Sequence, residues 1–226
     1  MIRIAIETAT PQGSVAVGRG ARPLAEVTLG IQRRHAETAL PALETALRLV
    51  GVGKDAVQAV VVGAGPGSFT GVRVAGATAK GLVAALGVPL LAYPSLLSLV
   101  AATPADGPVC GLFDARRGEV YGGCWRVTAS SLTPVLEPRV GQVDELLERL
   151  GPVPTAGPLF VGDGAERYRS ALERAGARVA DVPAWPRASS LLWLAEHHPE
   201  AGAVGDVAQW EPSYVRASSA ERGIAG

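Results

Sequence analysis

The sequence predicts an α/β protein built in two lobes, and three features of the chain support this. Short apolar runs alternate with turns over the first thirty residues, which is typical of β-strands. Segments with helical periodicity then alternate with further apolar runs. The segment Thr103-Pro104-Ala105-Asp106-Gly107-Pro108 interrupts this alternation and is the clearest candidate for a boundary. We therefore expect a first lobe over residues 1–104 and a smaller second lobe over residues 105–226.

The first lobe is predicted to start with a strand meander and to continue with alternating helices and strands. Turn residues such as Pro11-Gln12-Gly13 separate the first two strands. Gly51 and Gly53 end the first helix, and Ser95 begins the last one after Pro94. The expected strands are 2–7, 14–17, 24–29, 57–62 and 89–92, and the expected helices are 35–50, 72–86 and 95–102.

The second lobe is predicted to be shorter and interrupted by prolines. Its expected elements are a hairpin of strands 109–113 and 120–127, helices 144–150 and 166–175, and a short strand 159–161. Trp185, Trp193 and Trp210 need burial, which suggests that segment 189–226 packs back on the first lobe.

A glycine-rich loop, Gly65-Pro66-Gly67-Ser68-Phe69-Thr70-Gly71, connects the strand at 57–62 to the following helix. Such a loop can present backbone N–H groups to a phosphate, or it can be a tight turn in which glycine relieves steric strain. The spacing does not match a P-loop, a dinucleotide-binding fingerprint or a nucleophile elbow. Both interpretations stay open at this point.

At these residues the chain resembles the TsaB (YeaZ) family. The resemblance covers nearly the whole length. The matching segments are Ile4–Thr10, Arg34–Glu37, Gly65–Gly76, Ala79–Leu82, Asp114-Ala115-Arg116-Arg117-Gly118-Glu119-Val120-Tyr121 and Glu211-Pro212-Ser213-Tyr214-Val215-Arg216. This resemblance implies an actin/Hsp70/sugar-kinase-like (ribonuclease H-like) α/β fold of two lobes, the second abridged.

The family resemblance also implies a function without catalysis. It indicates a non-catalytic paralogue that binds and activates the transferase TsaD, together with the ATPase TsaE. The complex attaches a threonylcarbamoyl group to the adenosine next to the tRNA anticodon. The implied partners are TsaD and TsaE, with a homodimer when the chain is alone and tRNA contact only through the complex. A homodimer with an unrelated binding role is a further alternative.

The two long helices of the first lobe are the predicted partner interface. Their apolar faces are wider than one sheet can cover, so they need another helix or another chain. The expected interface residues are Leu40, Leu43, Leu47, Val50, Val72, Ala75, Ala79 and Lys80. The alternative is that the two helices cover each other and the second lobe.

The sequence offers little chemistry of its own. The histidines show no zinc spacing, and Ser95 and Leu99 stand where the catalytic relative TsaD has its His-x-x-x-His pair, so no metal is expected. A chain without catalysis is expected to have no cofactor of its own, with nucleotide only at the complex interface. An ATP-dependent phosphotransferase, in which the isolated chain binds Mg–ATP, is the alternative function. Its candidate phosphate contacts are Glu7, Thr8, Gly65, Gly67, Ser68, Thr70 and Gly71, although a solvated strand end is favoured for Glu7.

The overall composition limits the class of protein. The formal net charge of zero argues against a dedicated nucleic-acid binder. No apolar run is long enough to span a membrane, and the start of the chain leaves no room for a signal peptide, so we expect a cytoplasmic protein. Cys110 and Cys124 are expected to be free thiols, as is usual in a reducing compartment. Asp114, Arg116, Arg117 and Glu119 are expected to form local charge pairs, with a partner contact as the alternative.

Overall fold

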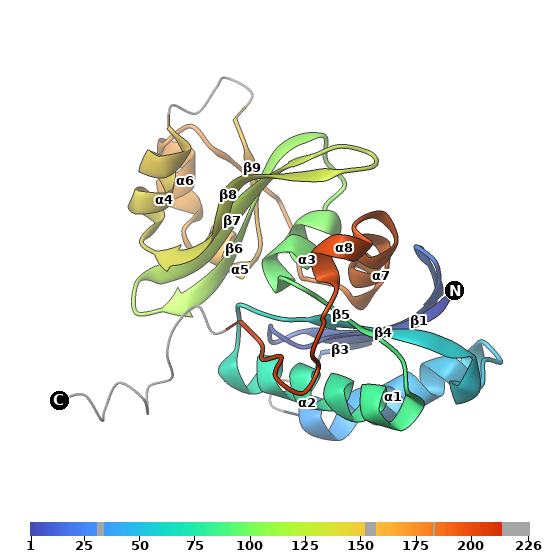
Figure 1. Ribbon diagram of the computed structural model, residues 1–226. Helices are drawn as coiled ribbons and strands as arrows, with labels where there is room; N and C mark the ends of the chain where they lie inside the picture. Colours follow the sequence, from blue (N-terminus) through green and yellow to red (C-terminus); the bar gives the residue numbers. More distant parts are fainter. Residues whose placement is uncertain (31–33, 152–156, 183, 214–226) are drawn as a thin grey trace. The chain divides into compact units, whose positions relative to one another are not determined.

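The computed structural model describes residues 1–30, 34–151, 157–182 and 184–213 in two compact units (Figure 1). Unit 1 comprises residues 1–102 and 186–213, and unit 2 comprises the described part of 103–185. The boundary after Ala102 is two residues before the expected one. The predicted division counted residues 105–226 as the second lobe, with segment 189–226 packing back on the first, and the structure places residues 186–213 in unit 1. The expected return of the chain beyond 213 lies outside the described residues.

Unit 1 is built on a five-stranded mixed sheet. Its strands are β1 (Ile2–Glu7), β2 (Gly13–Arg19), β3 (Arg22–Leu29), β4 (Val57–Gly63) and β5 (Leu90–Tyr93). The spatial order is β3-β2-β1-β4-β5, with β1 to β3 antiparallel and β4 and β5 parallel to β1. β1 and β4 are buried almost throughout, because helices cover both faces of the sheet.

The helices of unit 1 lie on the two faces of this sheet (Figure 1). On one face, α1 (His35–Leu49) packs on β2 and β3, and α2 (Phe69–Leu86) packs on β4 and contacts α1. On the other face, α7 (Ala188–His197) crosses β1 to β4 and contacts α3 (Ser95–Ala101) and α8 (Pro199–Gly202). A short 3₁₀ helix, η1 (Lys54–Ala56), precedes β4. The predicted helices of the first lobe are thus confirmed, and α2 begins three residues earlier than expected.

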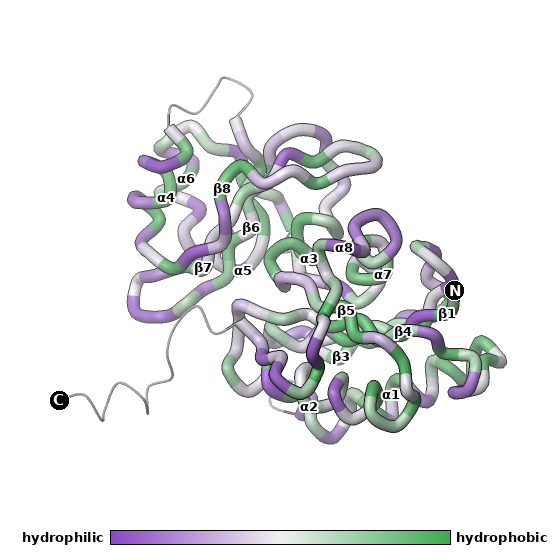
Figure 2. Tube along the Cα trace, in the orientation of Figure 1, coloured by the Kyte–Doolittle hydropathy of each residue, from purple (hydrophilic) through white to green (hydrophobic). Residues whose placement is uncertain are grey.

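Unit 2 contains a second five-stranded mixed sheet. Its strands are β6 (Gly107–Arg116), β7 (Glu119–Val127), β8 (Leu132–Gly141), β9 (Leu159–Val161) and β10 (Arg178–Val179), in the order β10-β9-β6-β7-β8. α4 (Val143–Leu150), α5 (Asp163–Arg167) and α6 (Arg169–Arg174) share one core with the sheet. The helix expected at 166–175 is therefore two short helices that meet at Tyr168. In Figure 2, α4 alternates between hydrophilic and hydrophobic residues along its length.

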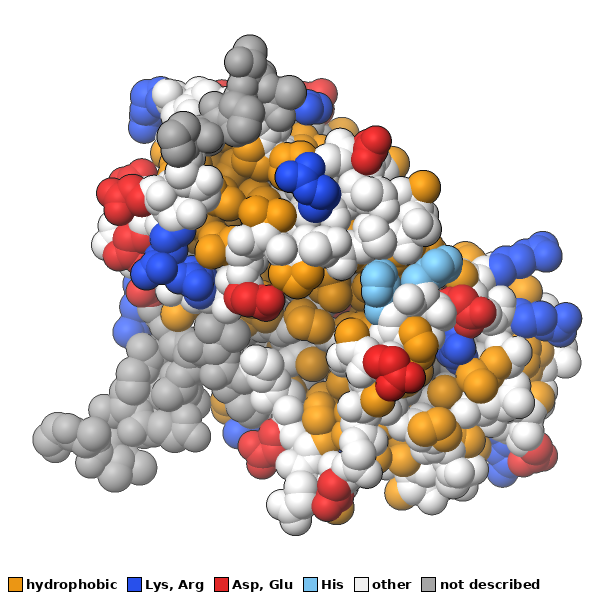
Figure 3. All heavy atoms as spheres, turned by 45° about the horizontal axis from the view of Figure 1, so that its top comes forward, with side chains coloured by type: hydrophobic (Ala, Val, Ile, Leu, Met, Phe, Trp, Pro, Cys, Tyr) orange, Lys and Arg blue, Asp and Glu red, His pale blue; other side chains and the backbone are white. Residues whose placement is uncertain are grey.

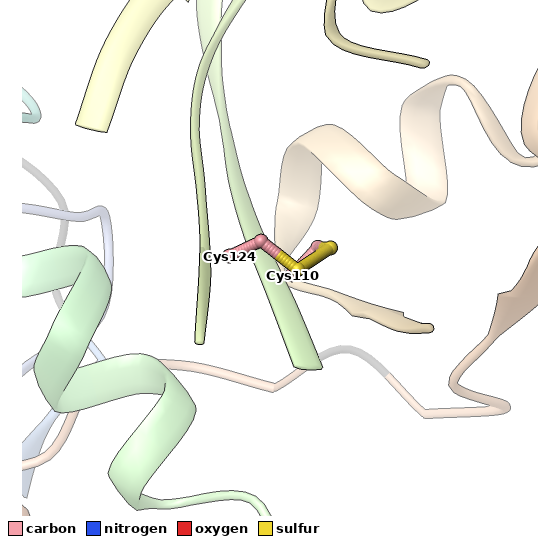
Figure 4. The surroundings of a disulfide bond; sticks show 2 residues. All are labelled: Cys110 and Cys124. Atoms are coloured by element: carbon pink, nitrogen blue, oxygen red, sulfur yellow. A yellow bond between two sulfur atoms is a disulfide. The ribbon is translucent and has the colours of Figure 1, made fainter. Parts of the chain in front are cut away.

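The expectation of two free thiols is wrong in this structure. Cys110 on β6 and Cys124 on β7 are directly opposite each other in the antiparallel register and are joined by a disulfide (Figure 4). Both residues are buried in the core of unit 2. Residues that face each other across adjacent strands bring their Cβ atoms close together, which sequence spacing alone does not show.

The surface carries both signs of charge. In the face shown in Figure 3, acidic and basic side chains are interspersed among apolar ones, and neither sign dominates. Within the described ranges, no helix is long and apolar enough to cross a bilayer.

Candidate functional site

The glycine-rich loop packs tightly onto the end of β1. Ser68 is the N-cap of α2, and its Oγ accepts a hydrogen bond from Gly71 N at 3.3 Å. The backbone N–H of Ser68 donates to Ala9 O at 2.7 Å. Both N–H groups, which could have faced a bound phosphate, therefore donate within the protein.

Two glycines of the loop are required by this close approach. A Cβ on Gly67 would overlap the Ala9 carbonyl oxygen, and a Cβ on Gly71 would overlap the Thr8 carbonyl oxygen. Thr8 Oγ1 also donates to Gly71 O at 2.7 Å. Of the two interpretations left open by the sequence, the close backbone approach accounts for these glycines.

Glu7 lies beneath this contact and is fully buried, so the expected solvated strand end is wrong. Its Oε1 accepts hydrogen bonds from Ala9 N at 2.9 Å and Ser95 Oγ at 3.1 Å. Burial raises the pKa of this carboxyl to about 7, because desolvation disfavours the charged form. The residues that lie against its carboxylate, Gly63 on β4 and Ser95 on α3, are far from Glu7 in the chain, so the local sequence does not reveal this burial.

Ser95 connects Glu7 to the loop. Its Oγ also accepts a hydrogen bond from Gly65 N at 3.2 Å, and its backbone N–H donates to Gly65 O at 2.7 Å. Ser95 and Leu99 are both fully buried, and Leu99 lies in α3. Glu7, Ser95 and the loop therefore form one hydrogen-bonded support at the carboxyl end of β1 and β4.

Of the candidate phosphate contacts, the structure leaves only a few accessible. Glu7, Thr8, Gly65 and Gly71 are buried, Gly67 is half-buried, and Ser68 and Thr70 are exposed at the start of α2. Among the described residues, no group of three His, Cys, Asp or Glu side chains is placed to hold a metal ion.

Four of the eight expected interface residues need correction. Leu43, Ala75 and Ala79 are buried in the core of unit 1, and Val72 is buried beside Gly65 of the loop. A partner cannot reach them, because one face of each amphipathic helix is used by the chain's own fold.

The remaining expected residues lie nearer the surface. Leu40 is 42% exposed, whereas Leu47, Val50 and Lys80 are half-buried, and Lys80 Nζ donates to Ala208 O at 3.0 Å. Sequence analysis missed two exposed apolar residues, Leu49 (72% exposed) and Phe69 (40% exposed).

The outer face of α2 carries small residues and few charges. The centre of the Phe69 ring lies 4.0 Å from the Arg73 guanidinium carbon. The other exposed residues of α2 are Thr70, Arg73, Ala77, Gly81, Ala84 and Ala85. Because α1 lies beside α2, Leu40 and Leu49 are exposed on the same side of the sheet. We call this set of exposed residues on α1 and α2 the outer helix face.

The hairpin between β6 and β7 contains one of the expected local charge pairs, with Arg116 Nη1 3.7 Å from Asp114 Oδ2. Asp114 Oδ1 accepts a hydrogen bond from Arg116 N at 2.9 Å, and Asp114 Oδ2 lies 3.3 Å from Arg167 Nη1. Arg116 and Arg117 both adopt positive φ angles, of 65° and 57°, and Gly118 completes the turn. Burial raises the pKa of the neighbouring Asp163 carboxyl.

Comparisons with known proteins agree with the fold. A family model described as "TsaD: tRNA N6-adenosine threonylcarbamoyltransferase" matches residues 25–222. The tRNA threonylcarbamoyladenosine biosynthesis protein TsaB of Bacillus subtilis is 30% identical over 98% of this chain and 96% of its own length. This chain belongs to the TsaB (YeaZ) family. The TsaB protein of Escherichia coli is 28% identical over 99% of this chain and 98% of its own length.

Solved structures of TsaB-like proteins have the same architecture. YeaZ from Pseudomonas aeruginosa superimposes with a TM-score of 0.78 at 30% identity and covers 94% of this chain and 99% of its own. A second Pseudomonas aeruginosa structure, described as similar to peptidase YEAZ, gives a TM-score of 0.81 at 32% identity and covers 95% of this chain and 99% of its own. The fold is therefore that of YeaZ, with two mixed five-stranded sheets.

Proposed function

We propose that this TsaB-family chain takes part in the biosynthesis of threonylcarbamoyladenosine in tRNA, in the cytoplasm, as a non-catalytic subunit. It binds the transferase TsaD, with the ATPase TsaE as a further member of the complex, and tRNA is contacted through the complex. Family membership supports the pathway, and the partner assignment follows from the resemblance. The single structural observation that supports a binding role is the outer helix face of α1 and α2.

The outer helix face suits association for two reasons. Its apolar residues are exposed although the sheet already has a complete core beneath the two helices. From Val74 to Leu86, the only charged residue of α2 is Lys80, whose amine is hydrogen-bonded to Ala208 O. Depletion of charge is typical of the buried centre of protein interfaces, and small residues such as Ala77 and Gly81 let a second helix approach closely.

The buried support around Glu7 favours a binding role over phosphotransfer. A phosphotransferase needs carboxylate oxygens that can reach a Mg²⁺ ion. Glu7 is fully enclosed and its Oε1 accepts two internal hydrogen bonds, and two N–H groups of the loop donate within the chain. We therefore propose activation by binding: a subunit without chemistry can act by stabilising the competent conformation of its partner.

Light scattering behind size-exclusion chromatography tests this proposal. The chain is run alone, where a homodimer is expected, and then mixed with TsaD from the same organism, where a mixed complex is expected. The variant Leu49→Glu/Ala77→Glu changes two exposed positions and should weaken the mixed complex by about tenfold or more, since charges at an interface centre must be desolvated.

The matched control is Val135→Glu, which changes an exposed apolar residue on β8 of unit 2 and should leave association unchanged. Leu43→Glu is not a suitable test, because Leu43 is buried and the variant would unfold unit 1. Absence of a mixed species at micromolar concentrations would overturn the partner assignment. Equal association by the Leu49→Glu/Ala77→Glu variant and the wild type would overturn the outer helix face as the interface.

A further inference from the structure

A small pocket lies between the end of β8 and the first turns of α4 in unit 2. Its volume is about 110 Å³, against the ~30 Å³ that a water molecule occupies in the liquid. It therefore has room for one small polyatomic ion. The lining residues are Val120, Arg139, Val140, Gly141, Gln142, Glu145, Leu146 and Arg149.

The position of Arg139 follows from the sheet register. Arg139 is paired with Gly122 on β7, and a Cβ on Gly122 would overlap Leu146 of α4. Paired residues on adjacent strands project to the same face, so Arg139 projects toward α4 and the core of unit 2. Its side chain is half-buried.

Arg139 has an unused donor in this setting. Its Nε is buried and has no hydrogen-bond partner within the described residues. Over the same residues, no carboxylate lies within ion-pair distance of Arg139 or Arg149, although both line the pocket. Because no carboxylate of the described residues neutralises either guanidinium group, an anion in the pocket would pair with them; the enclosed Nε itself is not the atom that such an anion would contact.

Glu145, the carboxylate residue among the pocket-lining residues, takes part in the cap of α4. Glu145 Oε2 accepts a hydrogen bond from Gln142 N at 3.3 Å, and the Gln142 side chain accepts one from the backbone of Glu145. This capping box satisfies the first turn of α4, so neither the helix end nor Glu145 compensates Arg139. Two guanidinium groups against one carboxylate leave the pocket with a net positive charge.

We propose that this pocket binds a small oxyanion, a carboxylate or phosphate group, with the guanidinium groups of Arg139 and Arg149 as the two cationic donors. A guanidinium group has a planar fork of N–H donors that matches the two oxygens of such an anion. The site is separate from the outer helix face, and its test does not involve TsaD.

The test is a titration of the isolated, full-length chain with inorganic phosphate and, separately, with acetate. Ionic strength is held constant with chloride, and the arginine Nε–H resonances are followed by NMR. We expect the Arg139 resonance to shift in a saturable way, with Kd in the range of about 1–10 mM for so small a ligand. Saturation by phosphate alone assigns a phosphate group, and saturation by acetate assigns a carboxylate.

Three variants make the result specific. Arg139→Gln should weaken binding by about tenfold or more, because it removes a charge-assisted hydrogen bond. Glu145→Gln keeps an acceptor for the capping box and removes the negative charge, so it should strengthen binding. Arg126→Gln, an exposed arginine on β7 that does not line the pocket, is the matched control and should bind as the wild type does.

Two outcomes would overturn the proposal. One is a linear, non-saturating shift of the wild-type Arg139 resonance with both anions. The other is equal affinity in Arg126→Gln, Arg139→Gln and Glu145→Gln. If Arg139→Gln fails to fold, the increase expected for Glu145→Gln decides the question, since that change keeps the helix cap.

Discussion

Replacing Gly71 by alanine should destabilise the protein, although alanine is the better helix former. Gly71 lies in the first turn of α2, where a Cβ would overlap the carbonyl oxygen of Thr8. The intrinsic gain of alanine over glycine in a helix is about 1 kcal/mol. Forcing an extra carbon into a closed site costs about 1–3 kcal/mol or more. The Thr8 oxygen belongs to backbone that Ser68 and Glu7 hold in place, so we expect the cost to exceed the gain, with a net loss of about 1–2 kcal/mol.

The matched control lies in the same helix. Gly81 is exposed on α2, and nothing lies within 4 Å of the position of an added Cβ. Gly81→Ala should therefore stabilise the protein by about 0.5–1 kcal/mol. The two changes are chemically identical and should have opposite signs.

Urea denaturation followed by circular dichroism measures both free energies of unfolding. The measurement is made at two protein concentrations, because Gly81 lies on the outer helix face and self-association would add to the apparent stability. If Gly71→Ala stabilised the protein as much as Gly81→Ala does, the close packing of the loop on Thr8 would be refuted.

Three further predictions concern the buried groups. The pKa of Glu7 rises from 4.5 to about 7 on folding, so the folded state binds the proton more tightly and stability should fall by up to about 3 kcal/mol between pH 4.5 and 7. Glu7→Gln should flatten that slope in urea titrations at several pH values. Ser95→Ala should cost about 1–3 kcal/mol in the same assay, because Gly65 N loses its acceptor and Glu7 loses a donor. Thiol counting in denaturant should find no free thiols until reductant is added, and two free thiols in the unreduced protein would contradict the disulfide. The Cys110→Ala/Cys124→Ala variant should be less stable by about 3 kcal/mol, because a disulfide that closes a loop of about 15 residues lowers the entropy of the unfolded chain and so raises its free energy by that amount.

The five strands and three α-helices within residues 1–102 were predictable because their signals are local. The apolar run at 57–62, the helical spacing from His35 and the turn after Pro11 each lie within a single element, and the structure has strands and helices at those places. β8 was missed because Pro134 and Pro138 weaken its strand signal. It is an edge strand of its sheet, where a missing backbone donor is tolerated.

The errors have a common physical cause: they concern contacts between segments far apart in the chain. Glu7 is buried because residues far along the chain enclose it: Ser95, which follows 88 residues later at the start of α3, donates to its Oε1, and Gly63 at the end of β4 lies against its carboxylate. Leu43 and Leu40 are both apolar residues of one helix, and only the position of the sheet decides which faces the core. The pairing of Cys110 with Cys124 depends on the register of β6 and β7 in the same way.

The glycine-rich loop shows how one sequence pattern can satisfy two different physical requirements. Glycine after a buried strand permits a phosphate to approach backbone N–H groups, and it equally permits another backbone to approach. In this chain Gly63 lies against the Glu7 carboxylate, Gly71 against the Thr8 carbonyl and Gly67 against the Ala9 carbonyl. Three glycines thus make room for three consecutive residues, which begin with the last residue of β1. The loop is thus held in place by its contacts with the residues at the end of β1. That fixed loop sets where α2 begins, and it therefore fixes the helix whose outer face we propose as the binding surface.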